Sequence, residues 1–226
     1  MGRPSTNLLS RSLIARTALE MYQREGAQNF SLRKLAKQLN VQSPSLYNHI
    51  DSQDDLVDAM HDVIQEEVDA QVLDNRDWRQ GISEHVRSYR SAYAKHPEVS
   101  LMIARRPILD SGLEWYDLQL RSFERYGLSS SEALHLSAAI DYLVFGSMAL
   151  PYVEGFDKAA GEYRDDYPHI AKALDATAKD ATNDEGFDWA LDRLLDGLEP
   201  LLEARKRAKH AEARSARALR RKSVPA

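Results

Sequence analysis

Cysteine is absent from the 226 residues of this sequence, and glycine and proline are scarce, at 10 and 8 residues. Without thiols there can be no disulfide framework, no thiolate metal site and no cysteine nucleophile, and this fits a reducing compartment. No apolar run approaches the roughly 18 residues of a membrane span. The first residues also lack the apolar core of a secretory signal. The composition therefore predicts a globular cytoplasmic protein with no membrane partner.

The net charge of −5 conceals an uneven distribution along the chain. Residues 1–50 carry seven basic side chains against two acidic ones, and residues 201–226 carry nine against two, which leaves −17 for residues 51–200. A basic head and a basic tail on an acidic body indicate an anionic partner at one or both ends. The alternative is a set of solvated helix faces followed by a disordered tail.

Apolar residues recur at intervals of three and four almost throughout, which predicts an all-α fold. In the first third of the chain we expect a helix over 10–25, one capped by Ser31, a short one capped by Ser43 with Pro44 at its first position, and one from Ser52 to about Val68. Gly26 is expected to end the first of these helices, and Asn40 to take the left-handed conformation after the second.

The rest of the chain shows the same helical period. The predicted helices cover 78–96, 112–126, 130–154 and 187–202, with a short segment around 101–106 that ends at Pro107. A polar stretch over 155–185 is expected to be a long loop with one loose helix. The helix over 130–154 is apolar nearly all round, which is typical of a central or subunit-interface helix. The basic residues 203–222 favour helix by composition, with fraying into disorder as the alternative.

Residues 31–50 have the pattern of a helix, a tight turn and a short helix, which is the pattern of a helix-turn-helix. In such a unit the second helix enters the major groove of DNA and its first residues meet base edges. The residues at that place are short or polar and suit bases and phosphates; they are Gln42, Ser43, Pro44, Ser45, Tyr47, Asn48 and His49. The alternative is an ordinary helical hairpin with a polar surface.

The stretch ARTALEMYQREGAQNFSLRKLAKQLNVQSPSLYNHIDSQDDLVDAM resembles the head of the tetracycline repressor (TetR) family of dimeric transcriptional regulators. The S-L-R-K-L-A helix and the L-Y-x-H core carry the resemblance. A weaker similarity to the ligand domain of the tetracycline-repressor branch continues through A-L-H-L-S-A-A-I and D-W-A-L-D-R-L-L-D-G-L-E to about residue 204. The resemblance implies a homodimer in which the helices over 130–153 and 187–204 form a four-helix bundle with their two-fold mates.

The same resemblance implies a DNA-binding helix-turn-helix domain over 1–55 and a ligand-binding and dimerisation domain over 56–204. The composition adds a basic tail over 205–226, for which disorder is the alternative to helix. It adds Leu32, Arg33 and Gln53 to the DNA-binding candidates, and Arg33 suits a bidentate guanine or phosphate contact. Tyr47 and His49 fit phosphate better than bases. Gln53 stands where most relatives have a phosphate-binding lysine, which predicts a weaker salt dependence.

For the ligand domain, the resemblance implies a pocket lined by aromatic and polar groups; the candidates are Asp69, His85, Tyr89, Met102, Arg106, Trp115, Gln119 and Leu134. Asp69 and Met102 match positions at which the tetracycline repressor uses histidines for a magnesium–drug chelate. We therefore predict neither magnesium nor tetracycline, and no cofactor. The alternative is core packing for Trp115 and Leu134, and a surface or internally satisfied polar role for Asp69 and His85.

The sequence thus predicts a repressor that binds a palindromic operator with two recognition helices roughly 34–36 Å apart and is released by a partly apolar small molecule. The fourth helix would carry the ligand signal to the head. A ligand-independent DNA-binding protein is the main alternative. We expect no enzyme, because nucleophile motifs, phosphate loops and zinc signatures are absent. Asp165, Asp166 and His169 resemble a metal cluster but lack supporting ligands.

Overall fold

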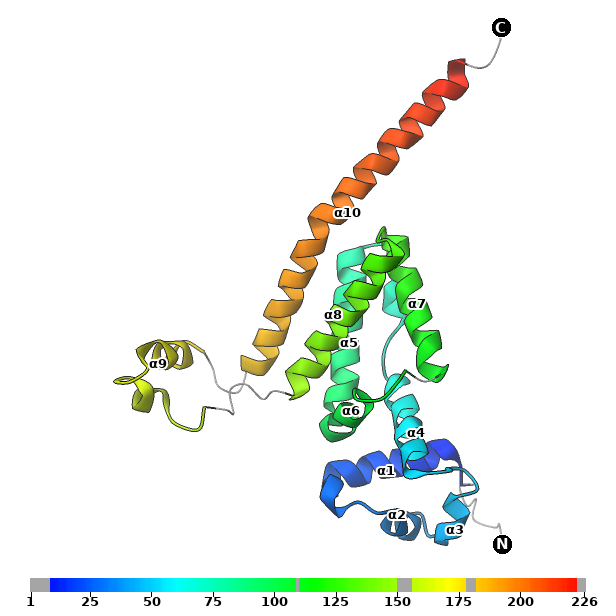
Figure 1. Cartoon of the computed structure of the whole chain (residues 1–226), viewed down its shortest axis with the longest axis vertical. Helices are drawn as coiled ribbons and strands as arrows, with labels where there is room; N and C mark the ends of the chain where they lie inside the picture. Colours follow the sequence, from blue (N-terminus) through cyan, green and yellow to red (C-terminus); the bar gives the residue numbers. More distant parts are fainter. Residues whose placement is uncertain (1–8, 109, 150–155, 178–181, 223–226) are drawn as a thin grey trace, which may run out of the picture.

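The structure, a computed structural model, describes residues 9–108, 110–149, 156–177 and 182–222 (Figure 1). Every regular element in these residues is a helix, so the predicted all-α class is confirmed for the described part of the chain. None of the described helices is long and apolar enough to cross a membrane.

The head is built from three helices and the start of a fourth; these elements are α1 (Arg11–Glu25), η1 (Ala27–Asn29), α2 (Leu32–Gln38), α3 (Ser43–Leu46) and α4 (Gln53–Gln65). Gly26 follows α1 with φ 76, and its N–H donates to the Tyr22 carbonyl, which ends the helix as predicted. Ser31 and Ser52 cap α2 and α4 by accepting hydrogen bonds from the N–H groups of Lys34 and Asp55.

Two predicted boundaries in this region are wrong. The N-cap of α3 is Gln42, with φ −80 and ψ 143, so Ser43 is already helical and Pro44 takes the second helical position. The helix α4 ends at Gln65 rather than near Val68, because the N–H groups of Glu67 and Val68 donate to carbonyls only three residues back and form a tighter turn.

The body follows; its elements are η2 (Gln71–Asp74), α5 (Trp78–Ala94), α6 (Pro97–Ile103), α7 (Asp110–Tyr126), α8 (Ser130–Ala149), η3 (Ala160–Tyr163), α9 (Pro168–Asp175) and α10 (Thr182–Lys222). The helix α6 begins at Pro97, four residues before the prediction, because proline suits the first turn of a helix and does not only end the previous one. The expected last turn of α8, over 150–154, lies outside the described residues.

The core of the body lies where α4, α5, α7, α8 and α10 meet, and Ile82, Phe123, Ile140 and Leu191 are completely buried there. Gly81 on α5 is closely packed: a Cβ at this position would meet the Tyr126 hydroxyl, which donates to the Leu73 carbonyl, and would lie 3.0 Å from the Val72 carbonyl oxygen. This contact joins α5 and α7 through η2.

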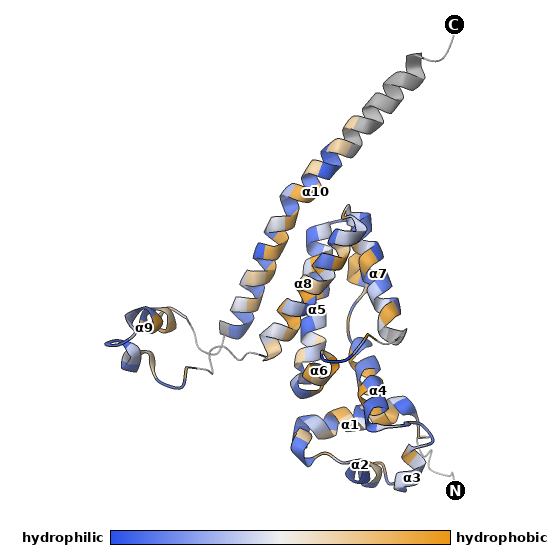
Figure 2. Cartoon of the chain, viewed as in Figure 1, coloured by the Kyte–Doolittle hydropathy of each residue, from blue (hydrophilic) through white to orange (hydrophobic). Residues whose placement is uncertain are grey.

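Hydrophobic residues recur along α8 and the first half of α10 (Figure 2), and some large apolar side chains of these helices lie on the surface of the single chain. Leu134 and Tyr142 on α8 and Trp189 on α10 are exposed, and the last two are 77% and 67% accessible. The small lobe formed by η3 and α9 stands away from the other helices (Figure 1). It corresponds to the loose helix predicted within 155–185.

The helix α10 continues to Lys222, well past the body and on the side opposite the head (Figure 1). Its backbone is thus helical over 205–222, where disorder was the alternative. Arg205 is not a free tail residue, since its guanidinium donates to the Gly127 carbonyl at 2.6 Å and to Glu132 at 2.9 Å. These bonds tie α10 to the turn between α7 and α8.

Candidate DNA-binding surface and effector cavity

The turn between α2 and α3 positions the candidate recognition helix. Asn40 takes φ 55, as predicted, and the next N–H, from Val41, donates to the Ala36 carbonyl at 2.9 Å. Leu46 and Ile50 are buried, so the two helices pack through these apolar residues. Tyr47 is 54% exposed beside them, although its ring is large and mostly apolar. An exposed aromatic residue with a polar tip beside a buried anchor suits contact with a phosphate backbone.

The structure brings most of the DNA-binding candidates to the surface of the head. Among the described residues, no acidic side chain pairs with Arg33, whereas its neighbour Lys34 approaches Glu25 at 3.6 Å. Leu32 packs partly against the core, and Ser43 and Ser45 are half-buried. The remaining candidates are exposed; they are Arg33, Gln42, Pro44, Tyr47, Asn48, His49 and Gln53.

An ion pair connects the first helix of the head to α4. Arg11 reaches the Asp55 carboxylate at 2.7 Å and its main-chain carbonyl at 3.1 Å, and the Asp51 N–H donates to the same carboxylate at 2.8 Å. Burial raises the pKa of Asp55, but the hydrogen bonds from Asp51 and Arg11 outweigh it and leave the pKa below its usual range. The head and the start of α4 are therefore one unit.

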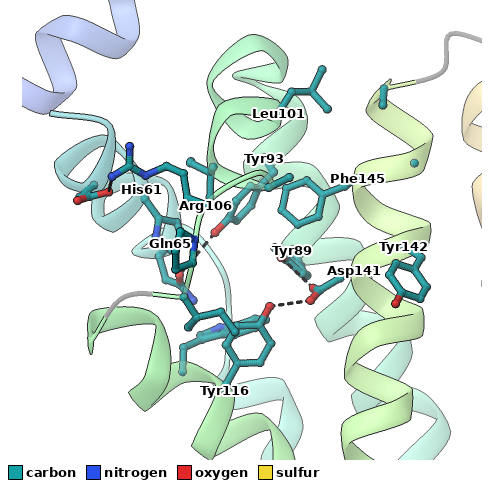
Figure 3. A pocket seen from close by; sticks show the side chains of 18 residues that line it. His61, Gln65, Tyr89, Tyr93, Leu101, Arg106, Tyr116, Asp141, Tyr142 and Phe145 are labelled. Atoms are coloured by element: carbon teal, nitrogen blue, oxygen red, sulfur yellow. Dashed lines mark hydrogen bonds and ion pairs between the residues drawn. The ribbon is translucent and has the colours of Figure 1, made fainter. Parts of the chain in front are cut away.

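The body contains a cavity of about 540 Å³ between α4, α5, α7, α8 and the segment after α6 (Figure 3). Much of its wall is aromatic. Tyr89 contacts Trp115 with ring centroids 5.1 Å apart, Trp115 contacts Tyr116 at 5.0 Å, and Tyr93 contacts Phe145 at 5.6 Å. A concave apolar site with a few placed polar groups is the usual form of a small-molecule site.

One carboxylate, Asp141 of α8, forms a polar point on this aromatic wall (Figure 3). The Tyr89 hydroxyl donates to its Oδ1 at 3.1 Å, and the Tyr116 hydroxyl donates to its Oδ2 at 2.6 Å. Burial raises the pKa of Asp141, and the two hydroxyl donors oppose that rise. Burial also raises the pKa of both tyrosines, so both hydroxyls keep their protons at neutral pH.

The opposite wall carries Arg106, which lies between the cavity and α4 (Figure 3). Its two terminal nitrogens lie 2.8 Å from Asp54 and 2.8 Å from Asp58. Burial raises the pKa of Asp58, and the charge of Arg106 opposes that rise. The Arg106 Nε, which is also buried, has no partner among the described residues.

Models of two protein families match the chain. The model for bacterial regulatory proteins of the tetR family covers residues 14–60, and that for the tetracyclin repressor-like C-terminal domain covers residues 73–202, more than half of the chain. The chain belongs to the tetR family. It is a ligand-responsive transcriptional repressor that acts as a dimer on a DNA operator.

Individual tetR-family proteins are similar to this chain over most of its length. The class A tetracycline repressor from transposon 1721 of Escherichia coli is 28% identical, over 84% of this chain and 90% of its own. A TetR variant of Acinetobacter baumannii AYE, solved with minocycline, has a TM-score of 0.66 at 24% identity and covers 85% of this chain and 94% of its own. ActR of Streptomyces coelicolor, solved with actinorhodin, has a TM-score of 0.66 at 21% identity, with coverages of 84% and 98%. The structural likenesses show a shared fold.

Three of the predicted ligand-binding residues, Tyr89, Arg106 and Trp115, line the cavity of this tetR-family chain. Two others form a buried polar chain behind it. The Gln119 amide lies 3.0 Å from His85 Nε2 and accepts a hydrogen bond from the Ser137 hydroxyl at 2.6 Å, while the His85 ring packs on Trp115 at 5.5 Å. His85 and Gln119 therefore support the wall and do not face the cavity.

The other three candidates do not line the cavity. Asp69 is exposed after α4, where its carboxylate accepts a hydrogen bond from the Gln71 N–H. Met102 packs against the core from α6, and Leu134 is 57% exposed on α8. Their side chains lie away from this cavity, and similarity of chain position does not indicate which way a side chain points.

Four prominent cavity residues were missed: Tyr93, Tyr116, Asp141 and Phe145. A signal for Asp141 was present, since it is the only charged residue between His135 and Ala149 in an otherwise apolar helix. No group of three metal-ligating side chains among the described residues is placed to hold a metal, and this includes Asp165, Asp166 and His169.

Proposed function

We propose that an effector in the aromatic cavity releases this repressor from a palindromic operator by detaching Arg106 from α4. The operator contacts would come from the exposed face of α2 and α3 and from Gln53, and α8 and α10 would pair with their copies in a four-helix bundle. The segments 1–55 and 56–204 would then act as the DNA-binding and the ligand-binding and dimerisation parts. We further propose a cytoplasmic protein without enzymatic activity.

The single observation that carries this proposal is the position of Arg106. Its side chain lines the cavity and is also the ion-pair partner of Asp54 and Asp58, in the first turns of α4. Asp55, which directly follows Asp54, holds Arg11 of α1. A ligand that moves Arg106 therefore changes the support of the same helical turn to which the head is attached.

The size of the expected effect follows from allosteric coupling. Coupling free energies of about 1–3 kcal/mol change affinity about 5–150-fold. Exposed ion pairs contribute little to stability, but the side chain of Arg106 is only 24% exposed and that of Asp58 only 19%. Their separation therefore leaves a partly buried charge without its partner, which is more costly than the loss of a surface pair.

A substitution tests the connection without any ligand. Arg106→Ala should lower operator affinity about 5–150-fold, because α4 then lacks the support that an effector would remove, while the dimer persists. The operator is first selected with the unaltered protein from random DNA, and affinity is measured by fluorescence anisotropy. Arg164→Ala is the matched control, since it removes the exposed Arg164–Asp175 pair of the small lobe. Equal operator affinity for both variants would refute the proposed route of release.

A further inference from the structure

We infer that the effector is an aromatic organic cation whose positive group is held by Asp141. This inference rests on the proposed function of the cavity and adds the chemical class of its ligand. It is argued from the charged groups that line the cavity and from the aromatic surface around the carboxylate of Asp141.

Among the described residues that line the cavity, Asp141 is the charged group without an oppositely charged partner. The hydroxyls of Tyr89, Tyr93 and Tyr116 stay neutral, because burial raises the pKa of each. His61 is neutral as well, since burial lowers its pKa. Asp58 pairs with Arg106 at 2.8 Å, and Arg106 also pairs with Asp54, which does not line the cavity. Among the described residues, the hydrogen bonds to the Asp141 carboxylate come only from the hydroxyls of Tyr89 and Tyr116.

The two tyrosine hydroxyls do not exhaust the carboxylate. Each oxygen of Asp141 accepts one hydrogen bond, whereas an ionised carboxylate offers about four acceptor sites. A buried carboxylate without a cationic partner is costly. A ligand that brings a positive charge to this point removes that cost, and a ligand that brings a negative charge increases it.

The walls around Asp141 suit the rest of such a ligand. Tyr89, Tyr116 and Phe145 present aromatic surfaces next to the carboxylate, and the faces of aromatic rings attract cations. A planar ligand also gains apolar contact in a cavity of about 540 Å³. On the opposite wall, the buried Arg106 Nε has no acceptor among the described residues. A hydrogen-bond acceptor at the other end of the ligand would fit there.

Three probes with the same fused rings test the sign of the charge: 10-methylacridinium, acridine at about pH 8, where it is neutral, and acridine-9-carboxylate. Binding is measured by titration calorimetry on the DNA-free dimer, which keeps intercalation out of the readout. We expect the cation to bind about tenfold or more tightly than neutral acridine, a difference of about 1.4 kcal/mol, and the anion to bind most weakly.

Two variants test the role of Asp141 itself. Asp141→Asn should weaken binding of the cation about tenfold and change acridine binding less than about twofold. Tyr116→Phe removes one hydroxyl that occupies the carboxylate, so it should keep or increase cation affinity and provides a second test if the first variant folds poorly. Asp117→Asn removes the same charge from an exposed position on α7 and should change nothing.

The inference is overturned if the cation does not bind, if acridine or the carboxylate binds as tightly, or if Asp141→Asn leaves cation binding unchanged. Those outcomes leave the proposed function standing, because the Arg106→Ala test of operator affinity uses no ligand. Conversely, selective cation binding together with full operator affinity in Arg106→Ala would support the ligand class and refute the route of release.

Discussion

In the head, most of the residues assigned to DNA are exposed, on or next to α2, α3 and the start of α4, and buried residues such as Leu46 and Ile50 hold the helices. In the body, the important residues are themselves buried: Tyr89 and Tyr93 are 3% and 1% exposed yet line the cavity. Function in the head therefore depends on side chains that can change without loss of fold. In the body, the same buried residues line the cavity and form part of the core, so a substitution there affects both ligand binding and stability.

The sharpest test of this division is Tyr47→Ala. The side chain is 54% exposed, so its loss should not disturb the fold, and the dimer should persist in sedimentation. Operator affinity should fall about 100-fold or more, since both heads of the dimer lose a contact and each 1.4 kcal/mol is a factor of ten. Probe binding in the cavity should stay unchanged. A variant with intact operator affinity would show that α3 is not the recognition helix.

The sequence predicted the head more closely than the body because the head is specified by local signals. Ser31, Asn40 and Ser52 act through neighbours a few residues away, and all three behave as predicted. The cavity instead joins residues from five parts of the chain. Apolar residues that recur every three to four positions identify the buried side of a helix, but they do not identify the side chains that face it from another helix. Tyr93 therefore looked like core packing, and Asp141 became visible as a site only beside Tyr89 and Tyr116.

Acid should act more strongly on the body than on the head, through His85. Burial lowers the pKa of His85 to about 4. The folded chain therefore leaves this ring uncharged where the unfolded chain, with a pKa near 6.5, takes up a proton. The contribution of His85 to the free energy of unfolding should be fully present above pH 6.5. About 3 kcal/mol of it should be lost as the pH decreases to about 4.

Urea unfolding at fixed protein concentration measures this loss. His85→Asn should make the decrease between pH 6.5 and 4 smaller by about 3 kcal/mol, with a remainder from His61 and His96, whose pKa values burial also lowers. His169→Asn is the matched control, because that histidine is exposed. An unaltered pH dependence in His85→Asn would mean that burial does not keep this ring neutral in the folded chain.

The smallest effect should come from the basic end of α10. A chain ended after Arg205 loses eight basic residues and one acidic residue but keeps the bonds to Gly127 and Glu132. At about 0.15 M salt, charges beyond roughly 8 Å are screened, and this end of α10 lies on the side opposite the head (Figure 1). Operator affinity should therefore change less than about twofold, well below the effect of Tyr47→Ala. A larger loss of operator affinity that grows at low salt would show that the tail contacts the DNA. Exposed residues outside the head would then also take part in DNA binding.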